Sequence, residues 1–219
     1  MNMNMAKIRG VIFDVDGVLL DSMGIWTDLG ARYLKSLGKE PEEDLGRTLF
    51  CMSMEQGAEY LNDHYQLNSS PEQVMEGLST MLRNFYFYEV KAKPGALELL
   101  ENVRAAGLKI TAATSSPREH IERAFERNGI LGYIERIFTN AEVGSSKHFP
   151  EIYNAAAQYM GTAAGETLVF EDSLYALQTA SNAGYLTVGV FDAKGEADQE
   201  GLRKISDIYI TELKDFRIE

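Results

Sequence analysis

Two aspartates, Asp14 and Asp16, follow an apolar run and stand just before Gly17. The run predicts a buried parallel strand over residues 8–13, and ligands of open α/β sheets bind just past the carboxyl ends of such strands. A carboxylate with an ordinary pKa of about 4 is ionised at pH 7, so it can act as a nucleophile without an activating base. The second carboxylate can pass a proton to a leaving oxygen and take one back from water. An ordinary aspartate turn is the alternative that this tetrapeptide alone leaves open.

Polar residues also follow three later apolar runs, and in a parallel sheet all of them would face the same edge. They are Thr114 with Ser115, Lys147, and Glu171 with Asp172. Thr114 and Ser115 precede a predicted helix, whose free N–H groups attract anions. We therefore expect both to bind phosphate.

The next residues, Ser116 to Glu119, have the pattern of a capping box. In this interpretation Ser116 is the N-cap, Pro117 is the first helical residue and Glu119 reaches back to the cap. Ser116 thus has a structural explanation, which Thr114 and Ser115 lack.

Lys147 by itself would be interpreted as a surface lysine. In a loop at the strand ends, however, the Lys147 ammonium would lie beside several carboxylates and could act on both the phosphate and the nucleophile. It can screen the repulsion between a phosphate dianion and an attacking aspartate, and it can hold that aspartate ionised. We therefore expect Lys147 to belong to the site.

Glu171 and Asp172 could simply complement a helix dipole. Together with Asp14 and Asp16, however, they would place up to four carboxylates in one cleft, which is costly unless a cation neutralises them. Oxygen ligands fit Mg²⁺ better than zinc, and no His/Cys set has zinc spacing. The pattern implies phosphoryl transfer in which Asp14 attacks phosphorus and Asp16 protonates the leaving alcohol.

The elements that position these residues fall into two groups. Helices are predicted over residues 23–38, 42–49, 54–65 and 71–90, with no convincing strand among them. Helices then alternate with strands: helices at 96–106, 117–128, 150–160, 174–183 and 199–205, and strands at 108–113, 136–139, 167–170, 186–190 and 208–210. Such alternation predicts an α/β fold with a parallel sheet and right-handed crossovers. The all-helical segment is then an insertion after the first strand.

Composition narrows the class of protein. The 219 residues are 45% hydrophobic and carry a formal net charge of −12, which argues against a nucleic-acid partner. The single cysteine, Cys51, rules out an intrachain disulfide, fits a reducing compartment and is interpreted as a small buried apolar residue. No signal peptide and no membrane span of about 20 apolar residues is evident. We expect a soluble cytoplasmic protein, either a monomer or a homodimer.

In their order along the chain, these residues resemble the motifs of the haloacid dehalogenase-like phosphatases that carry a helical cap after the first strand. The matching segments are Phe13 to Leu19, Thr114, Lys147 with Pro150 to Tyr153, and Glu171 to Ser173 followed by Ala180, Ala183 and Gly184. The resemblance spans nearly the whole chain. It implies a Rossmann-like core of residues 1–20 and 92–219 and a cap of residues 21–91.

The resemblance also implies roles for the site residues. Asp14 would be the nucleophile and Asp16 the acid and base. Mg²⁺ would be bound by Asp14, the Asp16 carbonyl and Asp172, with Glu171 assisting directly or through water. The implied reaction is hydrolysis of a small phosphorylated metabolite, with a sugar phosphate as the expected class.

Within the family, β-phosphoglucomutases and small sugar-phosphate phosphatases are the most similar. Mutases typically carry a His on the first cap helix and a cap Arg that grips a second phosphate. Here the cap helix has Trp26, and residues 50–55 include no Arg. This favours a phosphatase, leaves a phosphohexomutase as the alternative, and keeps a non-catalytic ligand-binding relative as the alternative from another class.

Overall fold

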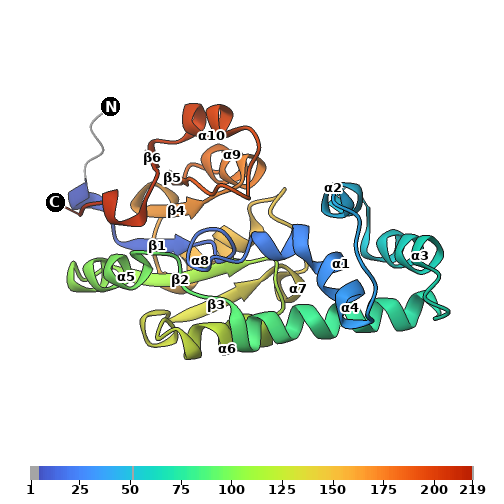
Figure 1. Cartoon of the computed structure of the whole chain (residues 1–219). Coiled ribbons are helices and arrows are strands. Elements are labelled where there is room, and N and C mark those ends of the chain that lie inside the picture. The colour runs from blue at the N-terminus through green and yellow to red at the C-terminus, as the bar shows by residue number, and fades with distance from the viewer. Residues whose placement is uncertain (1–4, 51, 219) are drawn as a thin grey trace. The chain divides into compact units, whose positions relative to one another are not determined.

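A six-stranded parallel sheet forms the centre of the computed structural model, which describes residues 5–50 and 52–218 (Figure 1). The strands are β1 (Gly10–Phe13), β2 (Lys109–Thr114), β3 (Arg136–Thr139), β4 (Thr167–Glu171), β5 (Leu186–Val190) and β6 (Ile208–Ile210). Their order is β3-β2-β1-β4-β5-β6, and every neighbouring pair is parallel. The predicted α/β fold with a parallel sheet is confirmed.

Strands β1 and β4 lie side by side at the middle of the sheet, with Phe13 opposite Phe170. All residues of both strands are buried, and the two phenyl rings lie 4.6 Å apart. Such continuous apolar runs are typical of strands covered on both faces. β1 begins at Gly10, two residues later than predicted, yet it ends at Phe13 as expected, so Asp14 is the first residue past the strand.

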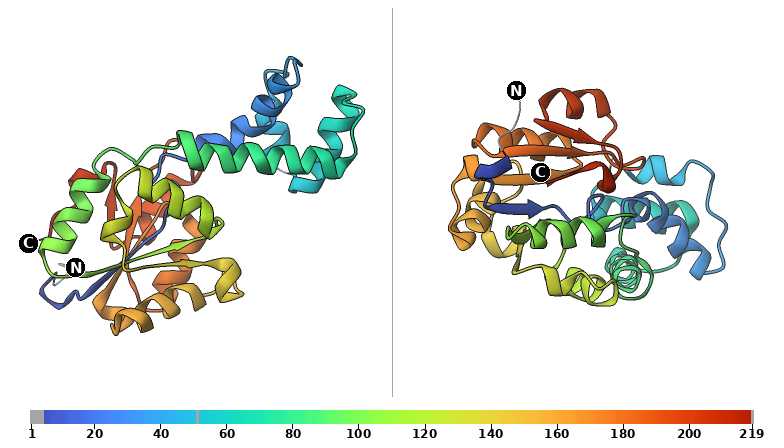
Figure 2. Two further views of the ribbon diagram at one scale, coloured as in Figure 1. Left: turned by 90° about the horizontal axis from the view of Figure 1, so that it is seen from below. Right: turned by 90° about the vertical axis from the view of Figure 1, so that its left-hand side faces the viewer.

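Helices cover both faces of the sheet (Figure 2). They are α5 (Ala96–Ala105), α6 (Arg118–Arg127), α8 (Glu151–Met160), α9 (Leu174–Asn182) and α10 (Gln199–Ile205). α5 and α6 pack on one face at β2 and β3, while α8 and α9 pack on the other; α10 packs against α9 and β6. This division follows from right-handed crossovers, because the strand order reverses direction after β3. The structure also contains a short α-helix that the sequence pattern did not predict, α7 (Asn140–Val143).

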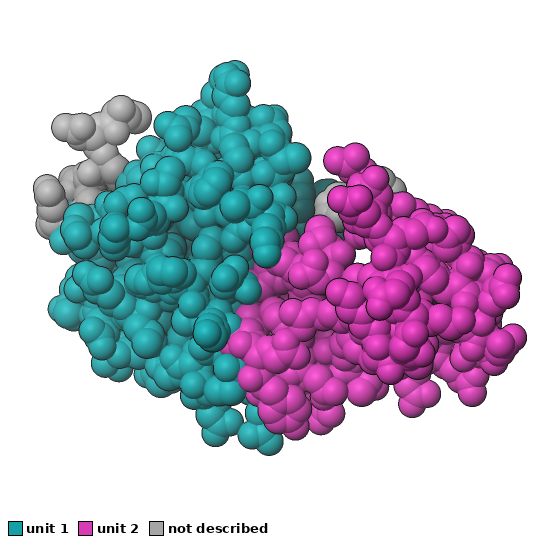
Figure 3. Space-filling model, in the orientation of Figure 1, with its two compact units in different colours: residues 1–21, 91–219 teal, residues 22–90 magenta. Residues whose placement is uncertain are grey.

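Residues 22–90 form a compact unit of their own, and residues 1–21 with 91–219 form the other (Figure 3). The smaller unit contains α1 (Gly24–Ser36), α2 (Leu45–Phe50), α3 (Met54–Tyr65), α4 (Pro71–Asn84) and a π-helical turn, η2 (Phe85–Glu89). α1 packs against α2 and α4, and α3 packs against α4. Among its described residues this unit has no strand. The single helix predicted over residues 71–90 is divided between α4 and η2.

The helical unit contains a cavity of about 310 Å³. Its walls are mostly apolar and include Trp26, Leu29, Leu49 and Leu61. Among the described residues that line it, Ser53 is the one polar side chain and no side chain is charged. The cavity therefore suits an apolar group and offers no cation for a phosphate.

The sequence predicts that Cys51 is buried and that the chain has no membrane-spanning segment. Cys51 lies outside the described residues, so its predicted burial stays a prediction. Over residues 5–50 and 52–218, no helix combines the length and the apolar character that crossing a membrane would require.

Gly46 allows α1 and α2 to approach closely, which gives a test of this packing. A Cβ atom at position 46 would lie 2.4 Å from the backbone carbonyl oxygen of Thr27. We expect Gly46→Ala to lower the free energy of unfolding by about 1–3 kcal/mol, because the backbone must shift to accept the methyl group. Denaturant titration followed by circular dichroism measures this change.

Gly132→Ala is the matched control. A Cβ atom at position 132 meets nothing within 4 Å, and Gly132 is not in the left-handed region. Its free energy of unfolding should stay within about 0.5 kcal/mol of the original protein. Equal effects of the two substitutions would contradict the packing argument.

Candidate active site at the carboxyl edge of the sheet

Asp14 is held in place by the sheet itself. Its backbone N–H donates to the carbonyl oxygen of Phe170 at 2.9 Å, which extends the β1–β4 ladder by one residue. The residue is 6% exposed. Asp14, the nucleophile predicted from the sequence, is therefore held at the carboxyl ends of the two central strands, β1 and β4.

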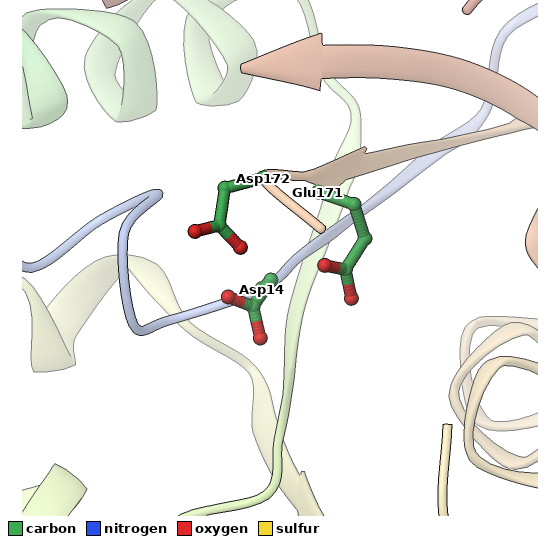
Figure 4. Close-up of side chains that lie close together, drawn as sticks. All are labelled: Asp14, Glu171 and Asp172. Atoms are coloured by element: carbon green, nitrogen blue, oxygen red, sulfur yellow. The ribbon is translucent and has the colours of Figure 1, made fainter. Parts of the chain in front are cut away.

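Three carboxylates meet where β1 and β4 end (Figure 4). One oxygen from each of Asp14, Glu171 and Asp172 lies within 4.8 Å of the others, and all three residues are buried. The carboxylate of Asp16 is not in this group. The structure thus brings together three of the four predicted acidic residues by their side chains.

Lys147 joins this cluster from the loop between α7 and α8. Its Nζ atom contacts Oδ1 of Asp14 and donates to Oε1 of Glu171 at 2.7 Å. The residue is 3% exposed, so this is a buried ion pair rather than a surface lysine. The prediction that Lys147 lies beside the carboxylates agrees with these contacts.

The electrostatics of the cluster follow from burial and crowding. Burial raises the pKa of Asp14 well above its ordinary value, and the Lys147 ammonium opposes the rise. Burial and the charge of Glu171 raise the pKa of Asp172 to about 8. Burial alone would lower the pKa of Lys147, but the charges of Asp14 and Glu171 outweigh it and the pKa is raised. Lys147 is therefore held as an ammonium.

A divalent cation fits the charge and the donor atoms of this cluster. If all three carboxyl groups were ionised, one ammonium would leave two negative charges uncompensated, and this crowding contributes to the raised pKa values of Asp14 and Asp172. Within the described part of the chain, Oδ2 of Asp172 is buried and has no hydrogen-bond partner. Such an oxygen is costly unless something positive binds it, and an all-oxygen set suits Mg²⁺.

Tyr153 supports Glu171 from α8. Its hydroxyl donates to Oε1 of Glu171 at 2.9 Å, the same oxygen that accepts from Lys147. Tyr153 is fully buried. The sequence placed Tyr153 behind Lys147 in a motif, but no spacing rule showed that its hydroxyl reaches Glu171.

The Asp16 side chain contacts the segment after β2 and does not join the cluster of Asp14, Glu171 and Asp172. Its Oδ2 accepts a hydrogen bond from the Ser116 hydroxyl at 2.7 Å, and the Thr114 hydroxyl lies 3.5 Å away. The Thr114 oxygen in turn accepts from the backbone N–H of Ser116 at 3.0 Å. Asp16, Thr114 and Ser116 therefore orient one another in the segment between β2 and α6.

The predicted role of Ser116 as an N-cap is wrong. α6 begins at Arg118, its N-cap position is Pro117, and no side chain caps it. The Ser116 hydroxyl instead faces Asp16. The sequence contained a local explanation for Ser116 that competed with this long-range contact, so the site role was missed.

Thr114 and Ser115, both predicted to bind phosphate, differ in position. Thr114 is fully buried beside Asp16, whereas Ser115 is exposed and its hydroxyl accepts from Nδ2 of Asn140 at 2.8 Å. Their phosphate-binding role stays a prediction.

Comparison with known proteins agrees with this geometry. Residues 11–190 match the sequence profile of the haloacid dehalogenase-like hydrolases. This span covers most of the chain, and the chain belongs to that family. It is therefore an enzyme of the α/β class.

Individual relatives are phosphatases and a mutase-type protein. A phosphorylated carbohydrates phosphatase of Thermotoga maritima is 30% identical over 178 residues, covering 81% of this chain and 82% of the relative. A glycerol-3-phosphatase of Arabidopsis thaliana is 25% identical and covers 97% of this chain and 73% of the relative. A solved Thermotoga maritima structure assigned to the β-phosphoglucomutases superposes with a TM-score of 0.85 at 25% identity, covering 95% of this chain and 96% of that one.

The contact between Tyr153 and Glu171 can be tested through stability. We expect Tyr153→Phe to lower the free energy of unfolding by about 1.5–3 kcal/mol, because it removes a hydrogen bond to a buried charged acceptor. Tyr185→Phe is the control, because Tyr185 packs in the same core cluster and donates at 2.9 Å to the neutral Oδ1 of Asn154. That change should cost only about 0.5–1.5 kcal/mol.

Denaturant titration of both variants in metal-free buffer measures the difference. An effect at position 153 no larger than that at position 185 would show that Glu171 does not depend on the Tyr153 hydroxyl.

Proposed function

We propose that the chain is a Mg²⁺-dependent phosphatase of a small phosphorylated metabolite, with sugar phosphates as the substrate class. The observation that carries the proposal is the buried cluster of Asp14, Lys147, Glu171 and Asp172 past β1 and β4. The names of the relatives supply the substrate class, since one acts on phosphorylated carbohydrates.

Asp14 is the proposed nucleophile. An oxygen of its carboxylate attacks phosphorus, the bond from phosphorus to the leaving oxygen breaks, and an aspartyl phosphate forms on Asp14. Lys147 screens the repulsion between the Asp14 carboxylate and the incoming phosphate, because its ammonium already contacts the Asp14 carboxylate. Thr114 and Ser115 are proposed to hold phosphate oxygens.

Asp16 is the proposed acid and base. It gives its proton to the leaving alcohol oxygen, then takes a proton from the water that attacks the aspartyl phosphate. Phosphate leaves and Asp14 is restored. The hydrogen bond from the Ser116 hydroxyl to Oδ2 fixes one oxygen of Asp16, which leaves the other oxygen for this transfer.

Asp14 and Asp172, together with the backbone carbonyl of Asp16, are the proposed holders of Mg²⁺, and Glu171 assists them. The unpartnered Oδ2 of Asp172 supports this assignment. When bound, Mg²⁺ supplies positive charge that offsets the charge on the phosphoryl group.

Residues 21–91 are the proposed cap, and residues 1–20 with 92–219 are the proposed catalytic core. The cap would close over the substrate and keep bulk water from the attack. Its cavity has no charged lining among the described residues, which favours a substrate with one phosphate.

A β-phosphoglucomutase-like phosphohexomutase is the second candidate, favoured by the structural similarity with a TM-score of 0.85. In that reaction a sugar hydroxyl takes the phosphoryl group from Asp14 in place of water. It needs a grip on a second phosphate, for which the cap cavity offers no cation.

The reaction is tested by phosphate release from sugar, polyol and nucleoside monophosphates. We expect Mg²⁺-dependent release from at least one of them, and Asp14→Asn should lower kcat by at least about 10³-fold because the amide is no nucleophile. Asp207→Asn is the control. Asp207 precedes β6 at the opposite edge of the sheet and accepts from Thr187, which an Asn can also do.

Full activity of Asp14→Asn would refute the proposed mechanism. Slow release from every compound, with rapid isomerisation of glucose 1-phosphate in the presence of a bisphosphate primer, would establish the mutase instead.

Metal binding is tested without turnover. Mg²⁺ at about 100 times its Kd should stabilise the protein by about 2.7 kcal/mol in thermal unfolding, and EDTA should remove the effect. Asp172→Asn should lose most of this stabilisation, since the amide replaces a charged ligand, whereas Asp207→Asn should keep it. Equal stabilisation of Asp172→Asn would remove Asp172 from the metal site. No response of the original protein would favour a non-catalytic relative.

A further inference from the structure

Lys93 is a partly buried lysine whose ammonium reaches two separate loops. Its side chain is 14% exposed. Nζ donates to the carbonyl oxygen of Gly17 at 2.5 Å, to that of Phe191 at 2.9 Å and to Oδ2 of Asp192 at 2.8 Å. One cation therefore joins the loop after β1 to the loop after β5.

The first of these loops carries Asp16. Gly17 follows it directly and lies in the left-handed region, with φ 80°. The Gly17 N–H donates to Leu20 at 3.0 Å, so the loop closes on itself. The Gly17 carbonyl, which accepts from Lys93, is one point where this turn is tied to the rest of the core unit.

The second loop lies against Asp172. Oδ1 of Asp192 accepts from the backbone N–H of Lys194 at 2.8 Å, which shapes the turn that follows β5. Gly195 in that turn lies so close to Asp172 that a Cβ atom there would be 2.7 Å from Oδ2 of Asp172 and 3.2 Å from Cβ of Asp192. The turn that lies beside Oδ2 of Asp172 is therefore shaped by Asp192, which is the ion-pair partner of Lys93.

The backbone fixes Lys93 itself. Its N–H donates to the Leu19 carbonyl oxygen, and the N–H of Asp21 donates to that of Lys91, both at 2.9 Å. Leu20 and Ala92 form an antiparallel bridge between these bonds. The two connections to the helical unit are therefore paired inside the core unit, and this pairing aims Lys93 at the two loops.

We propose that Lys93 is a positioning residue of the active site. Its ammonium fixes the position of the turn that carries Asp16. Through Asp192 it also fixes the position of the loop that packs against Asp172. This inference rests on the proposed phosphatase function. Removing a residue that orients metal ligands without touching the metal typically lowers metal affinity or activity by about 10–100-fold.

The test compares Lys93→Met with Lys109→Met. The methionine keeps most of the length of the side chain and removes the ammonium and its charge. Lys109 is the control, because its Nζ also donates to a backbone carbonyl, that of Met160 at 2.5 Å, but at the start of β2 on the opposite edge of the sheet.

For Lys93→Met we expect kcat to fall about 10–100-fold and the Mg²⁺ concentration at half-maximal thermal stabilisation to rise about 10-fold, with KM changed by less than about threefold. Lys93→Arg should recover part of both losses, because a planar guanidinium keeps the charge but cannot address all three acceptors from one atom. Lys109→Met should keep kcat and the Mg²⁺ midpoint within about twofold.

A Lys93→Met variant that only melts earlier, with kcat and the Mg²⁺ midpoint equal to those of Lys109→Met, would reduce Lys93 to a structural ion pair and overturn the proposal. An original protein that binds Mg²⁺ but releases no phosphate would refute the phosphatase function alone. The shift of the Mg²⁺ midpoint would then still decide the role of Lys93.

Discussion

The site depends on a buried ammonium that lies among carboxylates. Lys147 contacts Asp14 and Glu171 in surroundings that exclude water, and each of these charges would be costly without the others. Yet the ammonium can balance only one of the three negative charges that the cluster would carry with every carboxyl group ionised. A divalent cation would complete this balance, which is the physical basis of the proposed metal site.

The parallel sheet brings these groups together across long stretches of chain. Asp14 and Glu171 are separated by the whole helical unit and by most of the α/β alternation, but β1 and β4 are neighbours in the sheet. Their burial on both faces fixes the register, and the register fixes which residues emerge at the edge. The insertion leaves this intact because the paired segments at Leu20 and Ala92 close its base within the core unit.

Periodicity and motif spacing predicted the parts of the molecule that depend on neighbours along the chain. The strand ends, the helical insertion and the positions of Asp14, Lys147 and Glu171 follow from such patterns. The contacts of Ser116 and Tyr153 did not, because their partners lie on other elements and are set by tertiary packing. Ser116 shows the difficulty most clearly: a plausible local cap stood in place of a hydrogen bond to a residue 100 positions away.

The hydrogen-bond donors around the carboxylates differ from one carboxylate to the next. Oε1 of Glu171 already accepts from Lys147 and Tyr153, so its capacity for a cation is reduced. Oδ2 of Asp16 accepts from Ser116, which would orient Asp16 for the proposed proton transfer. Asp172 receives no such donor at Oδ2 within the described residues, and the loop at Gly195 closes over it. These carboxylates therefore differ in the neighbours that each one has, and the proposed metal site is best supported at Asp172, whose Oδ2 has no donor.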